Sequence, residues 1–167
     1  MAHMKIYGLL LTLLLCVLPT PAQNNKPVEA KNIPTVTFCD LVNNPDIFDG
    51  REVRFRATYL ANSKVATFVD QSCLAKDKRT WAEFDGLSIK AAAPPEIFER
   101  VKEQILCGKC GDDHQWRETE MLVTAIFRGD DFGHGRLGKY RFMVTVTNVE
   151  EIGMTEKVER TRFALQP

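Results

Sequence analysis

A pair of cysteines separated by two residues offers the most chemistry in this sequence. The segment Cys107-Gly108-Lys109-Cys110 is followed closely by Asp112, Asp113 and His114. Thiols at this spacing can form a disulfide, can exchange disulfides with another protein, or can bind zinc together with a histidine. The other cysteines of the chain bear on all three interpretations.

A structural disulfide is the interpretation that the cysteine count favours. After the first 22 residues the chain has four cysteines, namely Cys39, Cys73, Cys107 and Cys110. An even number in an exported chain is typical of disulfide bonding. Three pairings are possible, and they include a bond within the 107–110 segment and bonds from it to the earlier cysteines.

Two alternatives remain open for the 107–110 segment. In the thiol-exchange motif of the thioredoxin kind the cysteines begin a helix, whereas Cys107 follows a predicted helix. The negative end of that helix disfavours the thiolate, and Lys109 offsets only part of this effect. A zinc site would use Cys107, Cys110 and His114 with one of the two earlier cysteines. A single pair of this spacing is a weak metal signal.

The segment from Gly129 to Gly138 is the second candidate site. It connects the last two predicted strands, and such connections often bind ligands in small barrels. Its four glycines surround polar and aromatic side chains that can contact a ligand or a partner: Asp130, Asp131, Phe132, His134 and Arg136. The alternative is a flexible connector without a binding role. The two aspartates match no twelve-residue calcium loop.

The sequence contains no recognised catalytic motif. It has no Ser-His-Asp signature, no HExxH and no phosphate-binding loop. Glu96 and Glu99 in the predicted helix, and Glu150 and Glu151 after the last predicted strand, are interpreted as solvated carboxylates. The sequence therefore predicts a non-enzymatic protein without a cofactor.

One long strand organises the elements that would position these residues. From Val53 onward apolar or small residues occupy every second position, and polar residues lie between them, which is the period of a strand with one dry face and one wet face. The inward set is Val53, Phe55, Ala57, Tyr59 and Ala61, and the outward set is Glu52, Arg54, Arg56 and Thr58. Asp49-Gly50 starts the strand with a turn.

The remaining elements complete a five-stranded pattern. Thr37 caps a short helix through Asn43, and the long strand then forms a hairpin with 65–69. A third strand runs from Trp81 to Ile89 with a bend at Asp85-Gly86, and Pro94 and Pro95 open a helix over 96–106. Strands over 120–128 and 140–149 follow, the first with Met121, Val123, Ala125 and Phe127 on one face and the second with Tyr140, Phe142, Val144 and Val146.

This order predicts a mostly β fold. Three strands, a helix and two strands are typical of a five-stranded OB-type Greek-key barrel, here with a short N-terminal helix. The alternative is an open antiparallel sheet with one packed helix. Residues 158–167 form either a sixth strand or a frayed tail.

The front of the chain predicts export. Lys5 precedes an apolar run over 6–18, and Pro19-Thr20-Pro21-Ala22 follows, which is typical of a secretory signal peptide cleaved near Ala22. An uncleaved anchor or a lipoprotein modified at Cys16 are the alternatives. We expect a signal peptide over 1–22, a flexible leader over 23–34, the domain over 35–157 and a tail over 158–167, in a periplasmic or extracellular protein without a membrane span.

Charge argues against a nucleic-acid partner. The chain has 22 basic and 22 acidic residues, and removal of Lys5 with residues 1–22 leaves a net charge near −1. Single-strand binding surfaces combine basic residues with exposed aromatics. The outward face of the long strand offers Arg54 and Arg56 without an aromatic residue. Oligonucleotide binding through these arginines is therefore an alternative to the binding of a protein or a small envelope ligand.

Several short stretches resemble a known group of proteins. They are Phe38-Cys39-Asp40-Leu41, Asn44-Pro45, Phe48-Asp49-Gly50, Val53-Arg54-Phe55-Arg56-Ala57-Thr58-Tyr59, Asp70-Gln71-Ser72-Cys73 and Trp81-Ala82-Glu83-Phe84. Together they resemble small exported bacterial proteins of unknown function with an OB-type barrel, distantly similar to the barrel that binds transfer-RNA anticodons. The resemblance covers roughly residues 36 to 90. It implies a fold and an exported location, and it implies no reaction or ligand.

The alternation in the long strand leads to a first prediction. Phe55→Asp places a charge in the core and should unfold the domain, whereas Arg56→Asp changes the wet face and should leave the melting temperature within about 5 °C. Circular dichroism melting of the two variants measures this difference. Comparable losses in both variants would mean that the two faces are assigned wrongly.

Overall fold

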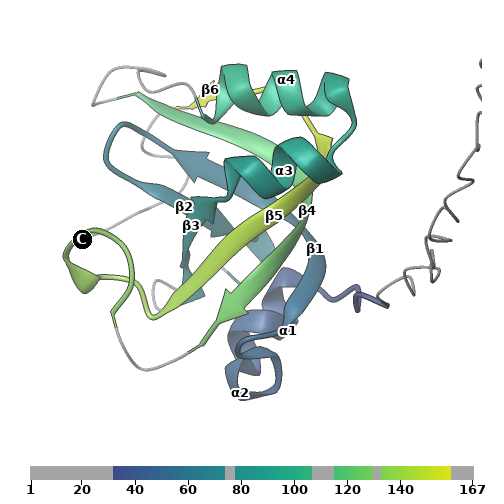
Figure 1. Cartoon of the computed structure of the whole chain (residues 1–167). Coiled ribbons are helices and arrows are strands. Elements are labelled where there is room, and N and C mark those ends of the chain that lie inside the picture. The colour runs from purple at the N-terminus through teal and green to yellow at the C-terminus, as the bar shows by residue number, and fades with distance from the viewer. Residues whose placement is uncertain (1–31, 74–77, 107–114, 130–132, 159–167) are drawn as a thin grey trace, which may run out of the picture. The chain divides into compact units, whose positions relative to one another are not determined.

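The computed structural model describes residues 32–73, 78–106, 115–129 and 133–158 (Figure 1). The strands are β1 (Glu52–Ala61), β2 (Ala66–Val69), β3 (Thr80–Phe84), β4 (Trp116–Arg128), β5 (Phe142–Ile152) and β6 (Glu156–Val158). The helices are α1 (Phe38–Asn43), α2 (Pro45–Phe48), α3 (Gly86–Ala92) and α4 (Pro95–Gln104), with 3-10 turns η1 (Gln71–Cys73) and η3 (Arg136–Gly138). Among the described residues no helix has the length and apolar character needed to cross a bilayer.

Five strands close into a barrel. The sheet order is β1-β2-β3-β5-β4, and β4 pairs back with β1, so the first and last members of the order meet. The β3–β5 pair is parallel and the other pairs of the barrel are antiparallel. This is the OB-type barrel that the sequence predicted, and the open-sheet alternative is wrong. Figure 1 shows β5 crossing the front of the barrel, with α3 beside its upper part and α4 along the top.

Strand β1 buries the face that its alternation predicted. Val53, Phe55, Ala57 and Tyr59 are all buried in the main core. The ring of Phe55 lies 5.5 Å from that of Phe68 in an edge-to-face arrangement, between centroids. Such aromatic pairs add about 0.5–1.5 kcal/mol to the free energy gained by burial. The core is therefore centred on the middle of β1.

The predicted third strand is correct at its start and wrong at its end. Strand β3 stops at Phe84, and α3 begins at Gly86 instead of continuing the strand to Ile89. The carboxylate of Asp85 caps the helix by accepting from the backbone N–H groups of Leu87 and Ser88. Hydrogen bonds from Ser88 also lower the pKa of Asp85. Ile89 still reaches the core, but from a helix.

The other helices follow their predicted signals closely. Thr37 caps α1 by accepting a hydrogen bond of 3.0 Å from the backbone N–H of Asp40. Pro95 occupies the first turn of α4, which lies between β3 and β4 in the chain and ends at Gln104, two residues before the predicted end. Its Val101 is fully buried against the core. Strand β6 pairs with the start of β4 and ends at Val158. Residues 159–167 lie outside the described residues, so the alternatives of a sixth strand or a frayed tail over 158–167 stay predictions.

The burial of Tyr59 gives a second prediction, for alkaline pH. Burial raises the pKa of Tyr59 to about 12, partly opposed by the charge of Arg117. In the unfolded chain the phenol ionises near pH 10, so stability present below that pH is lost as the pH rises towards the folded value. The loss in the free energy of unfolding should be on the order of 2 kcal/mol.

Urea unfolding of the wild type and of Tyr59→Phe, from about pH 9 to about pH 12, measures this loss. The wild type should lose more stability than the variant over the interval, because only the wild type carries the buried phenol. Parallel pH profiles for the two proteins would contradict the assignment.

Candidate functional site

The described part of the connection between β4 and β5, residues 133–141, lies over the outward side of β3. His134 and Tyr140 are joined by two backbone hydrogen bonds, of 2.7 and 3.2 Å, so the connection folds back on itself. Gly135 has a φ of +67°, and a Cβ atom there would lie 2.4 Å from the Trp81 ring. Only glycine allows this backbone to approach the indole so closely. The predicted rim therefore rests on β3.

Trp81 and Tyr140 form a half-buried aromatic pair on the outside of the barrel. Their ring centres are 5.4 Å apart, and the planes are tilted by 53°. The Trp81 indole N–H donates to a Glu83 carboxylate oxygen at 3.2 Å. Burial raises the pKa of Tyr140, and the charge of Arg79 partly opposes this shift. We refer to Trp81, Tyr140, Glu83, Arg79 and Gly135 as the aromatic surface.

The sequence did not single out this aromatic surface. The sequence pattern predicts a strand that begins at Trp81 and puts Tyr140 on the same face as Phe142. Phe142 is buried in the core, whereas Tyr140 precedes β5 and packs against Trp81. The two aromatics are far apart in the chain, and they meet because β3 and β5 pair in parallel. The alternation of residues along the strand around Trp81 is the one local signal that the Trp81 side chain points outward.

The predicted rim residues are only partly described. Asp130, Asp131 and Phe132 lie outside the described residues. His134 bonds through its backbone to Tyr140, and Arg136 begins η3, where its backbone alone is described. The structure therefore brings His134 to the aromatic surface, and the ligand-binding role of all the rim residues stays a prediction.

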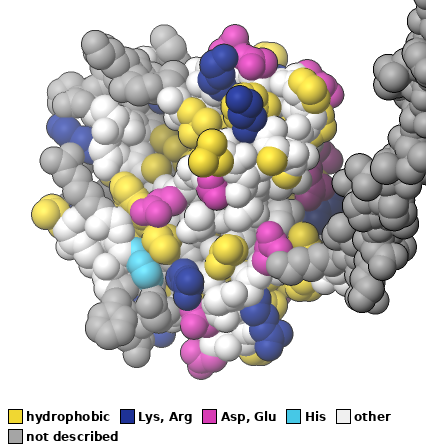
Figure 2. All heavy atoms as spheres, viewed as in Figure 1, with side chains coloured by type: hydrophobic (Ala, Val, Ile, Leu, Met, Phe, Trp, Pro, Cys, Tyr) yellow, Lys and Arg dark blue, Asp and Glu magenta, His cyan; other side chains and the backbone are white. Residues whose placement is uncertain are grey.

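Arg54 and Arg56 are engaged in ion pairs on the outside of the barrel. The Arg54 guanidinium donates to both carboxylate oxygens of Glu150, with its Nε at 2.9 Å from each, and Arg56 donates to Glu151. Glu150 and Glu151 were predicted to be solvated residues after the last strand. Their predicted position is wrong, because β5 continues to Ile152 and both carboxylates pair with arginines of β1. Glu150 is half-buried, whereas Glu151 is solvent-exposed as predicted. Figure 2 shows that basic and acidic side chains are interspersed over the visible face.

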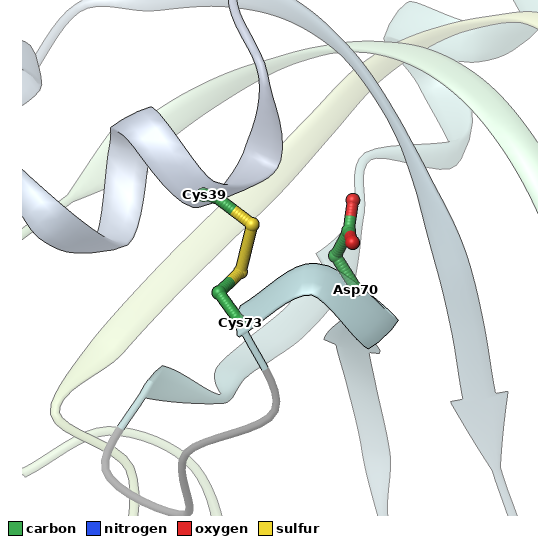
Figure 3. Close-up of side chains that lie close together, drawn as sticks. All are labelled: Cys39, Asp70 and Cys73. Carbon is green, nitrogen blue, oxygen red and sulfur yellow. A yellow bond between two sulfur atoms is a disulfide. The ribbon is translucent and has the colours of Figure 1, made fainter.

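Within the described residues a disulfide joins Cys39 and Cys73. It joins α1 to η1 with the two Cα atoms 5.7 Å apart (Figure 3). A carboxylate oxygen of Asp70 lies within 4.8 Å of both sulfur atoms. Metal ligation requires a thiolate, and the disulfide leaves none, so this cluster is not a metal site.

The Cys39–Cys73 disulfide also limits which residues could bind zinc. Cys107, Cys110 and His114 lie outside the described residues, so their disulfide or zinc chemistry stays a prediction. Cys39 and Cys73 are bonded to each other and cannot supply the fourth zinc ligand while that bond is intact. A disulfide from the 107–110 segment to either of them is excluded for the same reason.

Comparisons of the chain with protein-family models, with curated proteins and with solved structures found no match. The closed barrel is compatible with the OB-type fold that the resemblance implied. The implied likeness to anticodon-binding barrels has no support from a relative.

The Arg54–Glu150 pair gives a third prediction, for acidic pH. Hydrogen bonding from Arg54 lowers the pKa of Glu150, although partial burial opposes the shift. A lowered folded pKa stabilises the protein above the ordinary carboxyl value of about 4.3, and this contribution is lost as the pH falls. The side chains are 37% and 28% exposed, so solvent screening limits the contribution to about 0.5–1 kcal/mol.

Chemical unfolding of Glu150→Gln, with Glu151→Gln as the matched control, tests this prediction. At neutral pH the Glu150→Gln protein should be less stable than the wild type by that amount, and the difference should shrink as the pH falls below the ordinary carboxyl range and the wild-type carboxyl becomes protonated. Glu151→Gln should change stability less, because its pair with Arg56 is more exposed. A difference for Glu150→Gln that does not depend on pH would contradict an ion-pair origin.

Proposed function

We propose that the protein is an exported, non-enzymatic OB-type binding domain, and that it binds an oligosaccharide of the cell envelope at the aromatic surface. The observation that carries this proposal is the close packing of the Gly135 backbone against the ring of Trp81. This packing brings together a half-buried tryptophan, a nearby tyrosine and a glycine-rich connection on one side of β3. OB-type barrels commonly use this strand region and the connection between strands four and five to bind oligonucleotides and oligosaccharides.

The chemistry of the aromatic surface favours a sugar over a nucleic acid. Aromatic rings offer an apolar face for stacking, and polar groups beside them fix the orientation of the ligand. Glu83 is hydrogen bonded to Trp81, so a carboxylate lies beside the stacking ring and repels phosphate. Sugar hydroxyls can instead donate to that carboxylate and accept from Arg79.

Two further observations support export and binding without catalysis. The Cys39–Cys73 disulfide is typical of proteins in oxidising compartments, which fits a periplasmic or extracellular location. The aromatic surface presents stacking rings and polar groups without a nucleophile held by a base, which fits a binding role. The ion-paired Arg54 and Arg56 take no part in this surface.

Isothermal titration calorimetry with a soluble chitin oligosaccharide tests the proposal as a fourth prediction. The full-length mature protein should bind the sugar, and Trp81→Leu should weaken binding by about thirtyfold, because loss of a central tryptophan typically costs about 2 kcal/mol. Leu87→Ala is the matched control, since Leu87 is 83% exposed on α3 and its loss should leave affinity unchanged.

A pair of glycine variants tests the role of the connection. Gly135→Ala and Gly138→Ala both place a side chain at a positive φ, but only the Gly135 variant would clash with Trp81. Gly135→Ala should therefore reduce sugar affinity more than Gly138→Ala. Binding of an oligothymidylate in place of the sugar, with the steep salt dependence of phosphate contacts, would favour the nucleic-acid alternative. Equal sugar affinity in the wild type and Trp81→Leu would overturn the proposal.

A further inference from the structure

A second surface lies on a different part of the barrel from the aromatic surface. It is a groove of about 620 Å³, bordered on one side by residues 35–38 and on the other by Asp70 and Gln71. Between these borders lie Arg56, Ala57 and Thr58 of β1. A smaller hollow of about 260 Å³ shares Thr58 and Gln71 with the groove and extends it.

The groove occupies a gap in the hydrogen bonding of β1. Arg54 bonds through both of its backbone groups to residues 34 and 36, at 2.9 Å each. Further along the same edge, Thr58 is paired with Val69 of β2. Continuing that antiparallel register by two residues would place Gln71 opposite Arg56, but Gln71 belongs to η1 and has left the strand. The edge of β1 is therefore covered before and after Arg56.

The backbone of Arg56 points into this gap. Alternate residues of a strand direct their N–H and C=O groups to opposite sides, so Arg56 shares the direction of Arg54, away from β4. Within the described chain neither backbone group of Arg56 has a hydrogen-bond partner. One donor and one acceptor, spaced as in a strand, thus face a groove that a ligand can enter.

The charges that line the groove are mostly acidic. Asp70 and Glu120 border the larger part, and Glu118, Glu120 and Glu156 border its extension. Among the described side chains that line either part, Arg56 is the one basic residue, and its guanidinium pairs with Glu151. A cationic ligand is therefore favoured over an anionic one.

The disulfide fixes the width of the groove. Cys39 lies in α1, directly after the residues of one border, and Cys73 ends η1, which begins at Gln71 of the other border. The covalent bond holds the two borders together, as the proximity of Cys39, Cys73 and Asp70 shows (Figure 3). A preformed groove binds with a smaller loss of conformational entropy than one that must be ordered by the ligand.

We propose that this groove binds an extended basic peptide. One residue of the peptide would exchange a pair of backbone hydrogen bonds with Arg56, in the manner of strand addition, and its lysine or arginine side chains would lie beside Glu120 and its acidic neighbours. The groove is independent of the aromatic surface, and this inference does not rest on sugar binding.

Nuclear magnetic resonance of the ¹⁵N-labelled, oxidised mature protein provides the test. The probe is a capped peptide of alternating alanine and lysine, and the control probe alternates alanine and glutamate. The lysine peptide should shift the Arg56 amide proton downfield and slow its exchange with solvent, because the amide gains an acceptor. The glutamate peptide should bind more weakly. N-methyl groups can be placed on either of two alternating sets of peptide amides. In one of these two sets, N-methylation should abolish binding of the lysine peptide.

Three protein variants separate the contribution of the acidic groove from those of a remote carboxylate and of the aromatic surface. Glu120→Gln should weaken binding of the lysine peptide about two- to fivefold, as expected for a solvent-exposed ion pair, whereas the remote Glu99→Gln should not. Trp81→Leu should leave peptide binding unchanged, which distinguishes this site from the aromatic surface. The peptide proposal is overturned if the two peptides bind equally, if neither binds, or if the lysine peptide binds without changing the Arg56 amide.

Discussion

The pairing of β1 with β4 is the constraint on which the rest of the structure depends. Ten consecutive residues of β1, from Glu52 to Ala61, face Ile126 to Arg117 without a break in register. A shift of one residue would exchange the two faces of β1, placing Arg54 and Arg56 in the core and Phe55 in water. The burial of the inward face and the ion pairs on the outward face thus select the same register.

The groove and the aromatic surface lie at different places on the barrel. Residues 34–36 cover the first part of the β1 edge opposite β4 and β2 covers the last part, and the groove lies where these two segments diverge. The aromatic surface arises elsewhere, where β3 meets the connection that precedes β5. The groove thus forms where the edge of β1 changes partner, whereas the aromatic surface lies on the outward face of β3, which is paired on both edges.

Local patterns predicted the barrel, but long-range contacts determined its surfaces. The alternation around Phe55 identified a strand because the inward and outward side chains differ strongly in polarity. The end of β3 was missed because apolar residues in a short run fit a strand or a helix equally well, and the capping role of Asp85 decided between them. The partners of Glu150 and Trp81 were not predictable, since each lies far away in the chain and depends on the topology of the sheet.

The Cys39–Cys73 bond links residues 34 positions apart and encloses both β1 and β2 in one covalent ring. Closing a ring of this size restricts the unfolded chain and contributes about 3–4 kcal/mol on the chain-entropy model. A domain of ordinary stability has only about 5–15 kcal/mol in total. The thiol-disulfide balance of the surroundings therefore sets a large part of the free energy of unfolding. Protein molecules that reach an oxidising compartment before they are degraded would accumulate there. Molecules that stay in a reducing compartment would be exposed to proteases.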